Sequence, residues 1–148
     1  MTDITIRPLV KTDEAEWRQL WTDYLTFYKT SVPEEVYATT WERLFDTGEY
    51  EPNGLIAEVD GKPVGLVHYM LHRTCWTVGN NCYLQDLYAD PAVRGKGIGR
   101  ALIEAVYEKA DGAGAANVYW MTQDFNETAR KLYDRIAKLT PFIKYQRK

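Results

Sequence analysis

The stretch DPAVRGKGIGR, residues 90–100, decides the fold of this chain. It lies between an apolar and aromatic segment at 83–89, which predicts a strand, and an amphipathic segment at 101–110, which predicts a helix. Alternate glycines let the backbone turn with its N–H groups on one side, and a helix N-terminus adds unpaired donors and partial positive charge. The stretch therefore predicts a pyrophosphate site made of three glycines and three cations, namely Gly95, Gly97, Gly99, Arg94, Lys96 and Arg100.

Two common phosphate-binding loops do not fit this stretch. A Walker A loop has the pattern G-x-x-x-x-G-K-[ST], whereas here Gly97 follows Lys96 and Asp90 stands where the first glycine should be. A dinucleotide fingerprint, G-x-G-x-x-G, would need its third glycine at Arg100 and an acidic residue about twenty positions later, where the chain has only 118–120, V-Y-W. A glycine turn with solvated cations stays open as the alternative interpretation.

The composition predicts one small globular domain over residues 1–148. An apolar fraction of 45%, with 14% aromatic residues, supports a packed core. The net charge of −3 gives no electrostatic reason to expect nucleic acid or an anionic membrane as partner. No apolar run approaches the length of a membrane span, and the N-terminus lacks a signal-peptide pattern. Cys75 and Cys82 fit buried thiols better than a disulfide, so we expect a cytoplasmic protein.

Two histidines, His68 and His72, are four residues apart. This spacing would align them on a helix, but the segment 63–73 reads as a strand. We therefore expect two partly buried or cleft-facing imidazoles, and no metal site.

The hydrophobic pattern predicts elements in the order β-α-α-β-β-β-α-β-α-β. Thr12 or Asp13 can cap the first helix, Asp60-Gly61 is a hairpin signal, and the segment 74–81 reads as a loop or second hairpin. Asn126 can cap the last helix, which Pro141 stops. The expected strands are 4–8, 55–59, 64–71, 83–89, 117–121 and 142–145, and the expected helices are 13–28, 33–45, 98–111 and 126–139.

Two motifs in this order resemble the GNAT superfamily of N-acetyltransferases. R-G-K-G-I-G at 94–99 is similar to the family's coenzyme A loop, [QR]-x-x-G-x-[GA], and N-E-T-A-R-K-L-Y at 126–133 is similar to its N-x-x-A-x-x-L-Y signature. The order of elements matches the family over essentially the whole chain. The resemblance implies a single α/β domain with a mixed, mostly antiparallel sheet of six to seven strands and four helices. The family's glycine after the last helix is missing at 139–142, L-T-P-F, so the C-terminal turn should differ.

The resemblance implies that acetyl-CoA is the co-substrate. In this family the strand before the loop splays from its neighbour, so that its free backbone groups pair with pantetheine. The resemblance implies that a backbone donor on Leu87 or Tyr88 would meet the acyl oxygen. The Leu87 and Ala89 side chains would face the core. An ordinary paired strand is the alternative. The residues that the resemblance assigns to coenzyme binding are Leu87, Tyr88, Ala89, Arg94, Gly95, Lys96, Gly97, Ile98, Gly99, Arg100, Asn126 and Tyr133.

The resemblance also suggests catalytic residues. Tyr133 lies two helical turns after Asn126 on the same face and would be the general acid for the leaving thiolate, unless it only packs on the sheet. Polyamine acetyltransferases carry a glutamate where this chain has Gln85, and an amide cannot take a proton. We therefore expect direct attack by a deprotonated amine, or a water relay to Asp86 or another carboxylate. Asp86 could equally pair with a cation or cap backbone groups.

The acceptor pocket should lie between the first two helices, the segment 73–81 and the last strands. Its candidate linings are aromatic, with plain core packing as the alternative for each: Tyr24, Tyr28, Tyr37, Trp41 and Trp76. Three carboxylates nearby could attract a cationic amine or simply form a solvated helix face: Asp23, Glu34 and Glu35.

The segments 83–88 and 118–126 look like one branch of the family, the fungal histone/polyamine and D-amino-acid acetyltransferases, close to the spermidine/spermine acetyltransferases. That branch implies a homodimer, with 141–148 as a segment that could be shared. We expect an N-acetyltransferase that acts on a primary amine of a small molecule. A non-catalytic acetyl-CoA-binding regulator and a protein or histone acetyltransferase are the alternatives.

Overall fold

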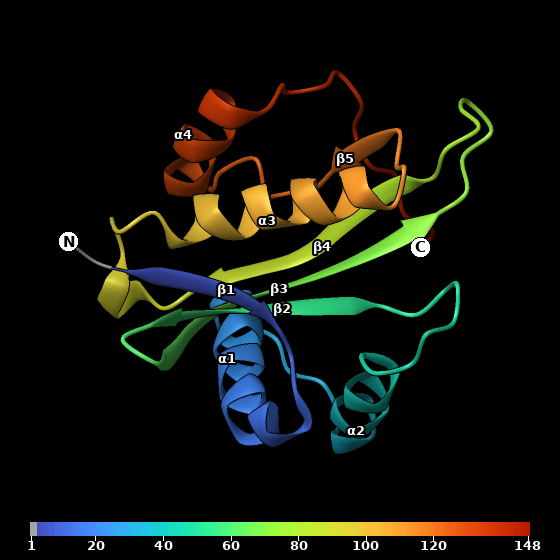
Figure 1. Cartoon of the computed structure of the whole chain (residues 1–148). Helices are drawn as coiled ribbons and strands as arrows, with labels where there is room; N and C mark the ends of the chain where they lie inside the picture. The colour runs from blue at the N-terminus through green and yellow to red at the C-terminus, as the bar shows by residue number, and fades with distance from the viewer. Residues whose placement is uncertain (1–2) are drawn as a thin grey trace.

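The computed structural model describes residues 3–148 and contains one five-stranded sheet. The strands lie in chain order, antiparallel except for the parallel pair β4–β5 (Figure 1). Their bounds are β1 Ile4–Pro8, β2 Asn53–Val59, β3 Lys62–His72, β4 Asn81–Ala89 and β5 Asn117–Tyr119.

Four α-helices cover the sheet, two on each face. In Figure 1, α1 (Glu14–Phe27) and α2 (Glu34–Arg43) lie on one face, and α3 (Ile98–Gly112) and α4 (Glu127–Ile136) lie on the other. No helix in residues 3–148 is long and apolar enough to cross a membrane. The α/β class, the four helices and the mixed sheet agree with the expectation from sequence. The domain prediction also included Met1 and Thr2, which lie outside the described residues.

The strongest local signals form the expected turns. Asp60 and Gly61 both have positive φ, 52° and 76°, which is the type I′ geometry of a two-residue hairpin between β2 and β3. The segment 73–80 joins β3 to its antiparallel neighbour β4, so the second hairpin also exists. Asp13 precedes α1 but does not cap it: its carboxylate accepts hydrogen bonds from the Arg7 guanidinium at 2.8 and 2.9 Å instead.

The sheet separates two apolar cores. Leu102, Ile103 and Val106 of α3 pack against one face of the sheet, and the side chains of Leu87 and Ala89 lie against this core as predicted. Trp17 and Leu20 of α1, with Trp41 of α2, pack against the other face. Strand β4 therefore directs side chains into both layers, and a residue on it can reach either one.

The C-terminal predictions need correction. Residues 142–145 form no strand, so the sheet has five strands rather than six or seven, and α4 ends at Ile136 rather than 139. Phe142 lies near the start of β5, in a groove with Asn117, but β5 has only three residues and offers little edge for pairing. Pro141 also disfavours helical geometry at the residue before it.

The thiols and imidazoles also differ from expectation. Both cysteines are free, but only Cys82 is buried, whereas Cys75 is exposed on the loop before β4. His68 is fully buried rather than partly so, and His72 is exposed. No group of three or more metal-ligating side chains comes together within residues 3–148.

Candidate active site

Strand β4 separates from β5 halfway along its length. The parallel ladder joins only Asn81, Cys82 and Tyr83 to β5, although β4 continues to Ala89. Within the described residues, 84–89 therefore have a strand neighbour on one side alone. A strand paired on both sides, the alternative left by the sequence, does not occur here.

The antiparallel register tells which backbone groups face this open edge. The Asp90 N–H donates to the Val64 carbonyl oxygen at 2.8 Å, and opposite residues alternate along the ladder between bonded and non-bonded pairs. The Tyr88 backbone therefore points toward β3, and the backbone groups of Leu87 and Ala89 point toward the open edge. Of the two donors predicted for the acyl oxygen, the geometry favours the Leu87 N–H.

The glycine loop leaves the open edge and leads into α3. Gly95 and Gly97 have positive φ, 83° and 81°, and no atom lies within 4 Å of where a Cβ would stand on either. Gly97 is also the N-cap of α3, and no side chain caps the N–H groups at this end of the helix. The backbone thus presents unpaired donors at a positive helix end to a space that an anion can enter.

The cations of the loop differ in their partners. Arg100 pairs with Glu104 one turn along α3, at 2.7 Å, whereas Arg94 and Lys96 are exposed and form no ion pair with any residue in 3–148. Ile98 is buried, and a Cβ added to Gly99 would lie 3.6 Å from Leu132 of α4. These two residues therefore also contribute to the packing of the core. The loop and the open edge together fit the pyrophosphate and the pantetheine amides of coenzyme A.

Helix α4 begins after its predicted N-cap, Asn126, and includes Tyr133. The Asn126 side chain accepts from the Ala129 N–H at 3.4 Å and donates to the Thr122 hydroxyl at 3.3 Å. Tyr133 is partly buried and meets Trp120 edge to face, with ring centroids 5.4 Å apart. Burial, with a smaller effect from Tyr28, raises the pKa of Tyr133 to about 12, so its phenol holds its proton across the neutral range.

Strand β4 has a bulge at Gln85, next to Asp86. The register pairs His68 with Asp86 but Tyr69 with Leu84, so Gln85 has no opposite residue. Gln85 is exposed, while Asp86 turns toward α1 and is only 8% exposed. The Asp86 carboxylate oxygen Oδ2 lies 3.0 Å from Nδ1 of His68.

Tyrosines connect Asp86 with Tyr133. Burial, the Asp86 charge and a hydrogen bond to Asp86 raise the pKa of Tyr24 far above its usual value. Burial also raises the pKa of Tyr28, although a hydrogen bond to Thr122 opposes this, and the charge of Asp86 adds to the increase. Tyr28 is near enough to Tyr133 to influence its pKa as well. The end of α1 thus joins the carboxylate on β4 to the phenol on α4.

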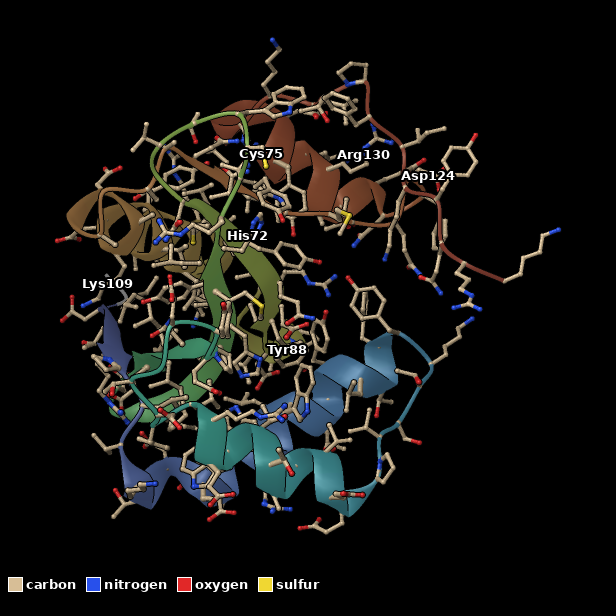
Figure 2. All side chains as sticks on the ribbon, turned by 90° about the vertical axis from the view of Figure 1, so that its right-hand side faces the viewer. His72, Cys75, Tyr88, Lys109, Asp124 and Arg130 are labelled. Carbon is tan, nitrogen blue, oxygen red and sulfur yellow. The ribbon has the colours of Figure 1, made fainter. Side chains whose placement is uncertain are left out.

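The other candidate linings are not part of this cluster. Trp41 is core, and Tyr37 packs on the same core with its hydroxyl 2.6 Å from that of Thr22. Trp76 is exposed at the loop before β4. Glu34 is paired with Arg18 at 2.8 Å, and this hydrogen bond lowers the pKa of Glu34. Figure 2 shows Tyr88 on the α1 side of the sheet, and Asp124 and Arg130 at α4 on the opposite side.

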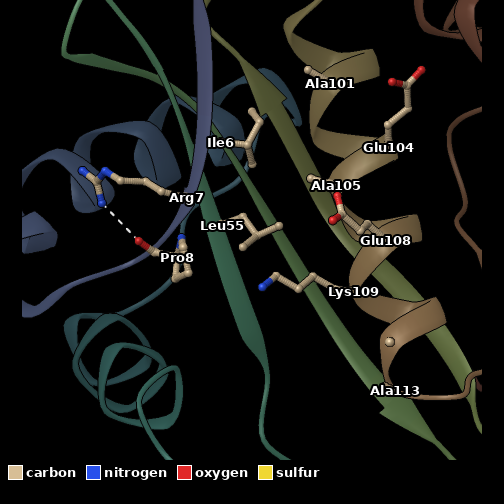
Figure 3. A pocket seen from close by; sticks show the side chains of 11 residues that line it. Ile6, Arg7, Pro8, Leu55, Ala101, Glu104, Ala105, Glu108, Lys109 and Ala113 are labelled. Atoms are coloured by element: carbon tan, nitrogen blue, oxygen red, sulfur yellow. Dashed lines mark hydrogen bonds between the residues drawn. The ribbon is translucent and has the colours of Figure 1, made fainter.

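A separate groove lies away from the open edge of β4. A groove of about 850 Å³ runs between β1 and α3, lined by Ile6, Leu55 and Lys109 among others (Figure 3). The guanidinium of Arg7, which also lines it, is already engaged by Asp13 and Glu58. None of the predicted site residues lines this groove, so we place the candidate active site at the open edge of β4.

Residues 15–137 match the Acetyltransferase (GNAT) family. The chain belongs to this family. As a GNAT acetyltransferase it takes its acetyl group from acetyl-CoA, which is the co-substrate for which the loop and the open edge provide a fitting site.

Individual relatives of this GNAT chain carry more specific names. It is 38% identical over 145 residues to the D-amino-acid N-acetyltransferase HPA3 of Saccharomyces cerevisiae, covering 97% of this chain and 90% of that protein. It is 36% identical over 92 residues to a thialysine N-epsilon-acetyltransferase of Sus scrofa, covering 56% of this chain and 53% of that protein. The crystal structure of a ribosomal-protein-alanine N-acetyltransferase from Brucella melitensis superposes with a TM-score of 0.79 at 27% identity, covering 99% of both chains.

Proposed function

We propose that this GNAT enzyme transfers the acetyl group of acetyl-CoA to a primary amine of a small molecule, an amino acid or a polyamine. The observation that carries this proposal is the environment of Asp86. Its side chain keeps 11% of its surface exposed, and no lysine or arginine in residues 3–148 pairs with it. A buried carboxylate without a cation is costly, so the site favours a ligand that brings an ammonium group. The names of the D-amino-acid and thialysine acetyltransferases support this class of acceptor.

On the donor side, acetyl-CoA supplies a thioester whose carbonyl carbon an amine can attack. The Leu87 N–H would donate to the carbonyl oxygen as that oxygen gains charge. The Ala89 backbone would hold the pantetheine chain along β4, and Arg94, Lys96 and the α3 N-terminus would hold the pyrophosphate. The cap Asn126 would bind close to the pantetheine.

On the acceptor side, Asp86 would hold the ammonium group until it loses its proton to solvent or to the carboxylate itself. The exposed amide of Gln85 has no role as a base. The neutral nitrogen then forms its bond to the carbonyl carbon, and the carbon–sulfur bond breaks with its electron pair on sulfur. The nitrogen releases its extra proton to solvent or to Asp86, which leaves the neutral amide. Tyr133 would donate its phenolic hydrogen to the sulfur. Because a pKa of about 12 exceeds the ~8.5 of a thiol, this donation acts first as a hydrogen bond to the leaving thiolate.

An acceptor panel tests the proposal. Release of coenzyme A thiol is measured with D-amino acids, L-amino acids, thialysine, polyamines and basic peptides, each with acetyl-CoA. Turnover with one of the small amines is the expected result. Tight binding of coenzyme A without turnover on any acceptor would contradict the proposal and favour a regulatory role.

A second candidate is acetylation of a protein N-terminus. The Brucella melitensis neighbour is named for a ribosomal protein, and its identity to this chain is 27%. The buried position of Asp86 favours small acceptors, because a peptide would need an open groove to reach it. Turnover on peptides alone in the same panel would favour this second candidate.

We also infer that residues 1–148 act as one domain, form a homodimer and function in the cytoplasm. Exposed apolar side chains at the C-terminus, Phe142, Ile143 and Tyr145, support a dimer, and the exposed free Cys75 fits a reducing compartment. Sedimentation of the chain and of a Phe142→Ser/Ile143→Ser variant tests the dimer. A monomeric wild-type chain would contradict it, and cell fractionation tests the location.

A further inference from the structure

His68 is enclosed between two indole rings behind Asp86. Its ring centroid lies 6.0 Å from that of Trp17 and 5.1 Å from that of Trp21, and the residue is 2% exposed. Because water does not reach this imidazole, its hydrogen bonds to protein groups determine where its proton lies.

The partners of His68 fix its tautomer. An indole N–H can only donate, and Nε1 of Trp17 lies 2.9 Å from Nε2 of His68. Nε2 must therefore accept, which puts the ring proton on Nδ1. Nδ1 lies 3.0 Å from Oδ2 of Asp86, so this proton is donated to the carboxylate. Both hydrogen bonds thus run in one direction, from Trp17 through His68 to Asp86.

This arrangement fixes the orientation of Asp86. The bond from His68 occupies one acceptor site on Oδ2. A carboxylate has about four such sites, so Asp86 has room for an ammonium group beside His68 and the Tyr24 hydroxyl. We propose that Trp17 and His68 are positioning residues, which hold the Asp86 carboxylate so that a remaining acceptor site meets the ammonium group of the acceptor. This inference rests on the proposed function, in which Asp86 receives the acceptor amine.

Two amide variants of His68 separate positioning from plain packing. An asparagine amide lies as many bonds from the backbone as Nδ1, and a glutamine amide as many as Nε2. His68→Asn therefore keeps a donor for Asp86 but leaves the buried Trp17 N–H without a partner. His68→Gln keeps a partner for Trp17 but removes the donor to Asp86.

If His68 positions Asp86, the two variants should rank in opposite order for thermal stability and for the KM of the acceptor amine. His68→Gln should raise the KM of the acceptor amine about tenfold or more, since a hydrogen bond to a charged group is lost, and leave the KM of acetyl-CoA unchanged. His68→Asn should restore most of that loss although it unfolds at a lower temperature. If the acceptor KM instead follows stability in both variants, His68 only packs and the proposal is overturned.

The tautomer of His68 is measured first on the wild-type protein. The chain has two histidines, so the ¹⁵N signals of labelled imidazoles are assigned with the exposed His72→Gln variant as reference. The wild-type protein should show a protonated Nδ1 and an unprotonated Nε2 for His68, and Trp17→Phe should shift the Nε2 signal. A proton on Nε2 of wild-type His68 would overturn the proposal.

Asp86→Asn separates this inference from the proposed function. If Asp86→Asn raises the acceptor KM and His68→Gln does not, only the positioning role fails. If Asp86→Asn leaves the acceptor KM unchanged, the proposed function of Asp86 fails, and the positioning role fails with it.

Discussion

Gly65 of β3 and Tyr88 of β4 approach so closely that a Cβ on Gly65 would stand 2.8 Å from the Tyr88 carbonyl oxygen. On the same side, Ile98 and Leu102 of α3 would be 3.1 and 3.3 Å away. This contact lets α3 pack tightly on the strands next to the glycine loop. The packing of α3 beside the proposed coenzyme site thus depends on one residue without a side chain.

Gly65→Ala should therefore destabilise the fold by about 1–3 kcal/mol, as overpacking of a core does. Urea unfolding measures this loss. Gly112→Ala is the matched control, because no atom lies within 4 Å of its added Cβ, and its stability should stay within about 0.5 kcal/mol of wild type. Equal losses in both variants would contradict the importance of this contact.

Asp13→Asn should destabilise the protein at neutral pH and not at low pH. The Arg7 hydrogen bonds lower the pKa of Asp13 in the folded state, so the stability it contributes is present above its unfolded pKa of ~3.9 and is lost as pH falls through the folded value. Denaturation at pH 7 should show a loss of about 1–3 kcal/mol. The two proteins should converge near pH 2.

The exposed pair Arg100–Glu104 is the control for this pH experiment. Its side chains are 57% and 56% exposed, and such pairs contribute about 0–1 kcal/mol. Glu104→Gln should thus change stability little at either pH. A pH-independent difference between wild type and Asp13→Asn would show that the carboxylate charge is not what stabilises this corner.

Arg94→Gln should weaken acetyl-CoA binding and little else. Arg94 has no ion-pair partner in residues 3–148, so its charge is available to the pyrophosphate. We expect the KM of acetyl-CoA to rise about tenfold, with the effect shrinking as salt increases. Lys109→Gln, which removes a cation from α3 away from the loop, should leave this KM unchanged.

Tyr133→Phe should lower kcat about 100-fold, in the range expected for general acid catalysis, while the acetyl-CoA KM changes little. Because burial raises the pKa of Tyr133 to about 12, the phenol stays protonated up to high pH. The kcat profile of the wild type should accordingly show no fall caused by Tyr133 below about pH 10. An unchanged kcat in the variant would remove Tyr133 from the mechanism.

Local signals were enough to predict most of the fold. The pair Asp60-Gly61, the cap Asn126 and the glycine loop all act within a few residues of chain, so sequence determines them directly. The strand expected at 142–145 does not form, because a strand needs an edge to pair with and β5 offers only three residues. Pairing partners are a property of the whole sheet.

The part of the site that sequence reasoning missed depends on contacts across the sheet. His68 reaches Asp86 only because β3 and β4 pair in one register with a bulge at Gln85. Trp17 meets His68 from a helix 51 positions earlier in the chain. The continuous apolar run along 63–71 could have placed His68 inside, but nothing in it indicated which residues it would meet.

The most direct measurement of the central claim is the steady-state rate of coenzyme A thiol release by wild type and by Asp86→Asn. The rate is measured over a range of concentrations of the best small amine of the panel. The two proteins should have the same KM for acetyl-CoA, and the variant should need about tenfold or more amine to reach half its maximal rate. An amine KM that Asp86→Asn leaves unchanged would contradict the assignment of this carboxylate as the acceptor site.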